Sequence, residues 1–123
     1  MDLEANKRIV KEFYELAFNA KQPEQAVEKY VGPRYIQHNP QAPDGPEAFV
    51  GFVRAFPEIS VDIRRVIAEG DIVVTHGVVR FTADDEHGTV AADLFRVEDG
   101  KIVEHWDVLQ PFPEESANPH PMF

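Results

Sequence analysis

The sequence predicts an α+β domain in which helices precede an antiparallel sheet and cover one of its faces. In the first half of the chain, apolar residues recur with the spacing of amphipathic helices. In the second half they alternate with polar residues, as in half-buried strands. Turn sequences such as Glu69-Gly70-Asp71 and Glu98-Asp99-Gly100 separate these alternating stretches.

The first predicted helix spans residues 2–20, with Asp2 as its N-terminal cap. The residues that define its apolar face are Ile9, Val10, Phe13, Leu16, Ala17 and Ala20. Lys7, Arg8 and Lys11 lie on the opposite side, so this helix is expected to bury one face only.

Two shorter helices are predicted over residues 23–31 and 47–56. Pro23 and Pro46 suit the start of a helix, because the first helical residue needs no hydrogen-bonded N–H group. Gly32 and the proline after it end the second helix. The third helix carries an apolar face made of Phe49, Val50, Phe52, Val53 and Phe56.

A short strand is predicted over residues 34–40, leading into a proline-rich loop. Alternation places Tyr35 and Gln37 on one side of this strand and Ile36 and His38 on the other. The loop is a candidate for function, because loops carry functional residues more often than cores do.

The rest of the chain predicts a meander of strands over residues 59–67, 72–82, 89–97 and 101–110. The alternation of the first of these slips at Arg65-Val66-Ile67, which predicts a β-bulge. One face of the second carries Ile72, Val74, His76 and Val78. In the last turn, Gly100 can adopt the left-handed conformation that a tight hairpin requires.

The composition describes one acidic domain. Its 123 residues carry a formal net charge of −10, which disfavours binding to nucleic acid or anionic membranes, because both require a positive surface. The chain has no cysteine, which excludes disulfides and thiolate metal sites. Residues 1–110 are predicted to form the domain, and residues 111–123 an extended proline-rich tail. We see neither a signal peptide nor a membrane span and expect a cytoplasmic protein.

Polar residues interrupt the predicted C-terminal hairpin in a way that a simple sheet would not require. Asp93, His105, Trp106 and Asp107 lie among β-branched and aromatic residues. Acidic residues are poor strand formers and are costly to bury without a partner. We therefore expect this hairpin to present ionisable groups inside a pocket.

Four segments in order resemble one known family. They read Y-I-Q-H-N-P at residues 35–40, D-G-P-E-A-F at 44–49, A-E-G-D at 68–71, and D-L-F-R-V-E-D-G-K-I-V-E-H-W-D-V-L-Q at 93–110. Together they resemble the SnoaL-like polyketide cyclases, which belong to a superfamily with nuclear transport factor two, ketosteroid isomerase and scytalone dehydratase. The resemblance covers nearly the whole chain.

The resemblance implies a cone-shaped fold in which a strongly curved antiparallel sheet wraps around three N-terminal helices. It also implies an apolar pocket inside the cone and a homodimer formed through the sheet. Characterised cyclases of this family close a ring by intramolecular aldol chemistry without a cofactor, and an acidic residue acts as acid and base. The position of that residue in the family corresponds to Asp107.

Five residues are therefore candidates for catalysis. Asp107 would move protons, and His105 shares its face of the strand and would assist it. Asp93 would form a carboxylate pair with Asp107 or a hydrogen-bonded dyad with His38 or His76; otherwise it is a satisfied buried acid that fixes strand register. His38, His76 or Asp93 would polarise the substrate carbonyl. A structural role remains open for each histidine.

Phe13, Phe52 and Trp106 are candidates for substrate binding. The alternatives are core packing for the two phenylalanines and a core or dimer contact for Trp106. The histidines show no metal-ligand spacing such as H-x-x-x-H, so we expect no metal site. There is also no nucleophile elbow and no Gly-rich phosphate loop.

These observations predict a cofactor-independent enzyme that acts on a small apolar carbonyl compound. A hydrolase or dehydratase using the same pocket is one rival, and a dimeric module that binds a hydrophobic ligand without chemistry is another. If only one of the five candidate polar residues faces the cavity, binding is favoured over catalysis. A cone filled by its own phenylalanines would instead indicate an interaction domain.

Overall fold

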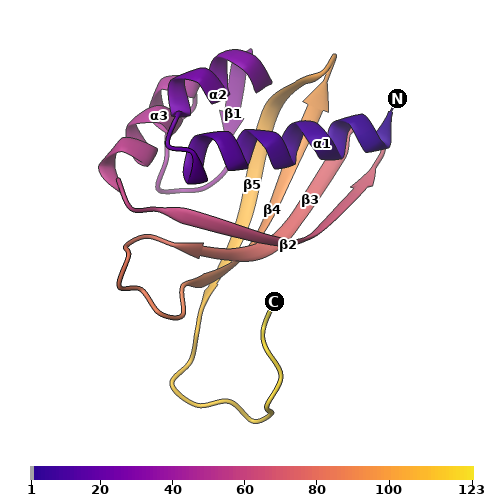
Figure 1. Cartoon of the computed structure of the whole chain (residues 1–123). Coiled ribbons are helices and arrows are strands. Elements are labelled where there is room, and N and C mark those ends of the chain that lie inside the picture. The colour runs from indigo at the N-terminus through magenta and orange to yellow at the C-terminus, as the bar shows by residue number, and fades with distance from the viewer. Residues whose placement is uncertain (1) are drawn as a thin grey trace.

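The computed structural model describes residues 2–123. The helices and strands follow the order α1 (Leu3–Tyr14), η1 (Glu15–Asn19), α2 (Pro23–Tyr30), β1 (Val31–Gln37), α3 (Pro46–Ala55), β2 (Ser60–Glu69), β3 (Ile72–Arg80), β4 (Thr89–Glu98) and β5 (Lys101–Pro111). Figure 1 shows the helices gathered on one side of a curved sheet. The predicted α+β architecture, with helices first and a strand meander second, is confirmed.

The sheet has the strand order β1-β5-β4-β3-β2. The pairs β2–β3, β3–β4 and β4–β5 are antiparallel, as the meander predicted. The expectation of a wholly antiparallel sheet is wrong at one edge, because β1 runs parallel to β5. A parallel neighbour requires a long connection, and the chain from α3 to β4 supplies it here.

The first predicted helix continues through residue 19 but changes its hydrogen bonding on the way. Asp2 caps α1 as expected, since its carboxylate accepts from the Ala5 N–H at 3.0 Å. After Tyr14 the helix widens into the π-helical turn η1. The Asn19 side chain then fixes this turn to β2 by bonding both the N–H and the C=O of Val61, at 3.0 and 2.9 Å.

The strand β1 begins three residues earlier than predicted, at Val31. Gly32 and Pro33 end the preceding helix as expected, yet they are also part of the strand. Pro33 is tolerated there because β1 lies at the sheet edge and its register with β5 is irregular between Val31 and Ile36.

The bulge predicted in β2 is present, with a register shift between Ile63 and Arg65. The strand β3 ends at Arg80, two residues before the predicted end, and β5 continues to Pro111. The tail after β5 contains no helix or strand. Its last residue returns to β2, where the Arg64 guanidinium lies 4.4 Å from the centre of the Phe123 ring.

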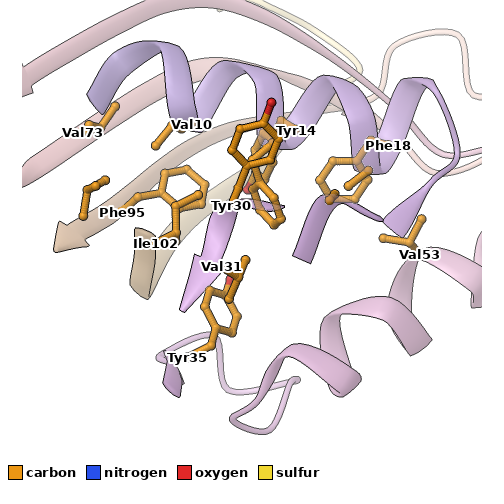
Figure 2. Packing of buried hydrophobic residues seen from close by; sticks show 14 of the residues in the cluster. Val10, Tyr14, Phe18, Tyr30, Val31, Tyr35, Val53, Val73, Phe95 and Ile102 are labelled. Atoms are coloured by element: carbon orange, nitrogen blue, oxygen red, sulfur yellow. The ribbon is translucent and has the colours of Figure 1, made fainter. Parts of the chain in front are cut away.

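One core joins the helices to the sheet, and Figure 2 shows Val10, Tyr14 and Phe18 gathered with Phe95 and Ile102. The largest fully buried side chains include Phe13, Phe95, Ile59 and Ile102. The face of the sheet turned toward the helices is called the inner face below. No helix within residues 2–123 has the length and apolar character needed to cross a membrane.

Candidate active site

A cavity of about 160 Å³ lies between the inner face of the sheet, α3 and the loop that follows β1. One part of its wall is aromatic and is formed by Phe18, Phe49, Phe52 and Phe81. The other part is polar and includes Asp93, His105 and Asp107. An apolar cavity of about 150 Å³ accommodates benzene, so this one has room for about a single ring.

Strand register brings the polar groups of the cavity together. Asp93 of β4 lies directly opposite Asp107 of β5, and Thr75 of β3 lies opposite Asp93 on the other side. Opposite residues on paired strands point to the same face. His105 joins them because it precedes Asp107 by two residues and side chains alternate along a strand.

Asp93 and His105 form a buried hydrogen-bonded pair. The Nε2 atom of His105 lies 2.8 Å from Oδ1 of Asp93. The Tyr14 hydroxyl donates to the same oxygen at 2.9 Å and lies 3.5 Å from His105 Nε2. Asp93 is 8% and His105 5% exposed, so both polar groups depend on these partners.

The last residue of β1 and the loop that follows it supply the remaining polar partners. The Asn39 side-chain amide donates to both carboxylate oxygens of Asp107 at 3.0 Å. Oε1 of Gln37 lies 2.8 Å from Nδ1 of His105. The Asn39 carbonyl group Oδ1 accepts from the Gln41 N–H at 2.8 Å, which orients the amide toward Asp107.

Two tyrosines in the cavity wall stay protonated far into the alkaline range. Burial, and then the charge of Asp93, raise the pKa of Tyr14 well above its ordinary value. The same two causes, in the same order, raise the pKa of Tyr35. The Tyr14 hydroxyl is therefore a donor at neutral pH, as its bond to Asp93 requires.

Asp93, His105 and Asp107 also place one ligand-type atom each within 4.8 Å of one another. Three such groups are enough in number for a catalytic zinc site. However, hydrogen bonds already engage both nitrogens of His105 and both oxygens of Asp107. A metal ion on His105 would have to displace Gln37 or Asp93 from one of its ring nitrogens, so the geometry favours a hydrogen-bonded site and we assign no metal to it.

Two of the predicted site residues lie on the outer face of the sheet. Trp106 follows His105 in β5, and alternation turns it away from the cavity. The His38 ring stacks on it, with 4.7 Å between ring centres and 6° between ring planes. His38 also bonds Glu104 at 2.7 Å, and together with Arg96 it lowers the pKa of that carboxyl. The predicted roles of His38 and Trp106 at the cavity are corrected accordingly.

His76 and Phe13 are likewise misplaced by the sequence-based prediction. His76 lies opposite Ala92, one residue out of phase with Thr75, and therefore faces outward. Its Nδ1 atom accepts from Arg65 at 3.1 Å. Phe13 is fully buried in the core, packed on Phe49 with 4.9 Å between ring centres. Neither side chain lines the cavity.

Asp93, His105, Asp107 and Phe52 do line the cavity. The predicted dyads of Asp93 with His38 or His76 do not form, because its histidine partner is His105. Sequence analysis missed Tyr14, Gln37 and Asn39. The alternation in β1 had already placed Gln37 and His38 on different sides of the strand, which was a signal for Gln37. The position of Tyr14 among the apolar residues of α1 was a signal for that hydroxyl. The sequence held no signal for Asn39, because the geometry of the loop determines its contact with Asp107.

The comparisons with known proteins agree with this architecture. A family model described as the SnoaL-like domain matches residues 10–105. The chain belongs to the SnoaL-like family. A search of curated proteins found no match. The family resemblance seen in the four sequence segments is thereby confirmed.

Solved structures with a similar fold include proteins of the expected kinds. A candidate ketosteroid isomerase from Kribbella flavida is 17% identical with a TM-score of 0.75, over 97% of this chain and 85% of that chain. A candidate polyketide cyclase from Acidithiobacillus ferrooxidans is 22% identical with a TM-score of 0.72, over 85% of this chain and 87% of that chain. TsrD from Streptomyces laurentii is 21% identical with a TM-score of 0.71, over 89% of this chain and 90% of that chain. At these identities the likeness shows the cone-shaped fold.

Proposed function

We propose that this SnoaL-like protein is a cofactor-independent acid/base enzyme that acts on a small apolar carbonyl compound. The observation that carries the proposal is the position of Asp107 beside the Asp93–His105 pair, in the wall of a cavity that is otherwise largely apolar. A base and a proton donor at the end of an apolar pocket are what proton transfer next to a carbonyl requires.

In the proposed reaction, the Asp107 carboxylate removes a proton from the carbon next to the carbonyl. The negative charge that develops on the carbonyl oxygen is stabilised by a proton from the Asp93–His105 pair, which lies in the same wall. The enolate carbon then attacks a second carbonyl of the same molecule, and the new alkoxide takes up the proton that Asp107 removed, which restores the carboxylate. In an isomerisation, the proton would return to a different carbon instead.

The number of polar residues at the cavity favours catalysis over simple binding. Three of the five candidates, Asp93, His105 and Asp107, line it. A site that only held an apolar ligand would gain nothing from burying an acid and a histidine beside a second, partly buried acid, since burying such groups costs free energy.

Exchange of carbon-bound protons for deuterium tests the proposal without the natural substrate. The protein is incubated in D₂O with small cyclic ketones such as cyclohexanone and cyclohexenone, and deuterium uptake is followed by mass spectrometry. We expect the protein to accelerate uptake at the carbon next to the carbonyl. Asp107→Asn should lower the rate by about 10²–10⁴-fold, the range typical of a lost general base.

His76→Gln is the matched control, because His76 is on the outer face and should leave the exchange rate unchanged. Circular dichroism and thermal unfolding would establish that both variants are folded. Exchange that survives Asp107→Asn would contradict the assignment of the base. Ketones that bind without any exchange would favour a ligand-binding module.

A homodimer through the outer face of the sheet is part of the same proposal. Trp106 and Val108 alternate with the cavity residues of β5, so they face outward, and Val108 is 69% exposed. Val108→Glu should shift the protein to monomer in sedimentation equilibrium, because a charge at an apolar interface is costly. Leu3→Glu, at an exposed apolar position in α1, should not. A wild-type monomer at high concentration would contradict this part of the proposal.

A further inference from the structure

We infer that Gln37 is a positioning residue that fixes the imidazole of His105 with its proton on Nδ1, so that the Asp93–His105 pair holds a second, shared proton and acts as the acid of the site. This inference rests on the proposed function and deepens it, because it divides the acid and base roles between two neighbouring acidic residues.

The first step is the orientation of the Gln37 side chain. The backbone N–H of Asn39 points at Oε1 of Gln37 with 3.0 Å between nitrogen and oxygen. A backbone N–H can only donate a hydrogen bond, so the atom it meets must be the carbonyl oxygen of the amide. If the amide were reversed, its NH₂ group would face another N–H. The neighbouring loop residue therefore determines which end of Gln37 faces His105.

The second step is the tautomer of His105. The same Oε1 atom lies 2.8 Å from Nδ1 of His105. Because a carbonyl oxygen only accepts, Nδ1 must carry a proton and donate it. The hydrogen bond at one ring nitrogen thus decides the state of the other, as is usual for histidines in functional sites.

The third step is the proton between His105 and Asp93. A neutral imidazole protonated on Nδ1 has a bare lone pair on Nε2. That atom lies 2.8 Å from Oδ1 of Asp93, a distance at which two bare acceptors would repel each other. One further proton must therefore lie between them. The pair is either imidazolium with carboxylate or imidazole with carboxylic acid, and its net charge is zero in both cases.

The surroundings leave the second acidic residue as the base. The ionisable groups that face His105 are Tyr14 from α1, Tyr35 from β1, Asp93 from β4 and Asp107 from β5. The Tyr14 hydroxyl donates its own proton to Asp93, so this hydrogen bond does not require the proton shared between Asp93 and His105. Asp107 receives two contacts from the side-chain NH₂ group of Asn39, which can only donate and so matches a carboxylate. The site therefore places a proton-bearing pair next to a proton-accepting carboxylate.

Nuclear magnetic resonance of the full chain with ¹⁵N-labelled imidazole rings tests the inference. Long-range ¹H–¹⁵N correlation spectra distinguish the two neutral tautomers and the cation, and loss of one spin system in His105→Asn assigns the signal. In the wild-type protein we expect His105 to be protonated on Nδ1 across the pH range in which the protein stays folded. A ring with its proton on Nε2 and a bare Nδ1 would overturn the inference without any further variant.

Two substitutions then identify Gln37 as the cause. Gln37→Leu removes the acceptor, and we expect the His105 spectrum to lose its persistent Nδ1 proton and to show the other tautomer or a mixture. Gln37→Glu keeps an oxygen that accepts from both His105 and Asn39, and should restore the wild-type pattern. Gln110→Leu is the control, because Gln110 lies on the outer face of β5, the strand that carries His105. This variant should leave the pattern unchanged. An unchanged His105 spectrum in Gln37→Leu would overturn the role of Gln37.

These spectra require no substrate, so they separate this inference from the proposed function. An Nδ1-protonated ring that depends on Gln37, together with no deuterium exchange on any ketone, would uphold the proton arrangement and contradict the enzyme. Exchange that depends on Asp107, together with the opposite tautomer, would uphold the enzyme and contradict the acid assigned here.

Discussion

Two aspartates of the same cavity differ because their hydrogen-bond partners differ. Asp93 is buried against a tyrosine hydroxyl and an imidazole, whereas Asp107 is only partly buried and meets an amide from a loop. Both carboxyl groups lie in one cross-strand pair. Their chemical division therefore comes from the partners that α1 and β5 give Asp93 and from the amide that the loop after β1 gives Asp107. The pairing of β4 with β5 places the two carboxyl groups next to each other.

The hydroxyl of Tyr14 should stabilise the fold through its bond to Asp93. Tyr14→Phe keeps the ring, which packs on Phe95 with 5.1 Å between ring centres, and removes only the buried donor. Hydrogen bonds to charged groups are worth about 1.5–3 kcal/mol, so urea unfolding should show a loss of that size. Tyr30→Phe removes a hydroxyl that bonds the exposed Glu12 and should cost less than about 1 kcal/mol. Equal losses would contradict the importance of the buried bond.

At the residue scale, the sequence predicted strand-borne groups better than helix- and loop-borne ones. Alternation correctly put His105 and Asp107 on one face and Trp106 on the other. It did not say which face of β3 is the inner one, and so His76 was misplaced. Phe13 was predicted at the cavity, where its neighbour Tyr14 lies instead. Adjacent helical residues differ by about 100° in direction, and only the docking of α1 on the sheet determines which one reaches the cavity.

At the scale of elements, the close approach of β2 and β3 shapes the cavity wall. Gly77 of β3 lines the cavity where β2 bulges next to Arg64. A Cβ atom at Gly77 would lie 2.1 Å from the backbone oxygen of Asp62, a distance that no relaxed structure permits. The bulge and the glycine therefore belong together, because the bent strand passes where a side chain would otherwise lie.

Substituting two glycines should change stability in opposite directions. Gly77→Ala forces β2 and β3 apart and should lower the free energy of unfolding by about 1–3 kcal/mol or more, as overpacked sites do. Gly51→Ala lies in the middle of α3, where the added methyl group meets nothing within 4 Å. That variant should gain up to about 1 kcal/mol from helix propensity. Urea unfolding measures both, and a neutral Gly77→Ala would contradict the close packing.

The elements themselves could be predicted from local patterns, whereas their pairing could not always be. Proline at the starts of α2 and α3, and the slipped alternation in β2, are local signals, and each was correct. The parallel pairing of β1 with β5 joins residues about 70 positions apart, as in Gln37 with His105, and has no local signature. The π-helical turn after Tyr14 likewise has a partner far away in the sequence, because Asn19 at its end bonds Val61 of β2.

At the scale of the whole molecule, the cone buries tyrosines together with acidic groups. Tyr14 and Tyr35 are 6% and 4% exposed, and both lie near Asp93. Burial and this charge raise the pKa of both phenols, so the folded protein keeps two protons that the unfolded chain releases near pH 10. Through proton linkage, this arrangement determines how stability depends on alkaline pH.

The sign of that dependence is fixed by the direction of the two pKa shifts. Below the unfolded tyrosine pKa of about 10, both states are protonated and the full stability is present. Above it the unfolded chain ionises while the native state does not, so stability falls by about 1.4 kcal/mol per pH unit for each such tyrosine. The fall continues until the pH reaches the raised native pKa.

Tyr35→Phe should make this fall less steep. Because phenylalanine does not ionise, the variant lacks one of the two protons, and its stability should decline by about 1.4 kcal/mol less per pH unit above pH 10. Urea unfolding at several values between about pH 9 and 11.5 measures the slope, and the difference from wild type cancels the titration of lysines, which both proteins share. Parallel curves for the two proteins would mean that Tyr35 ionises equally in both states, and that the cavity wall does not exclude water from it.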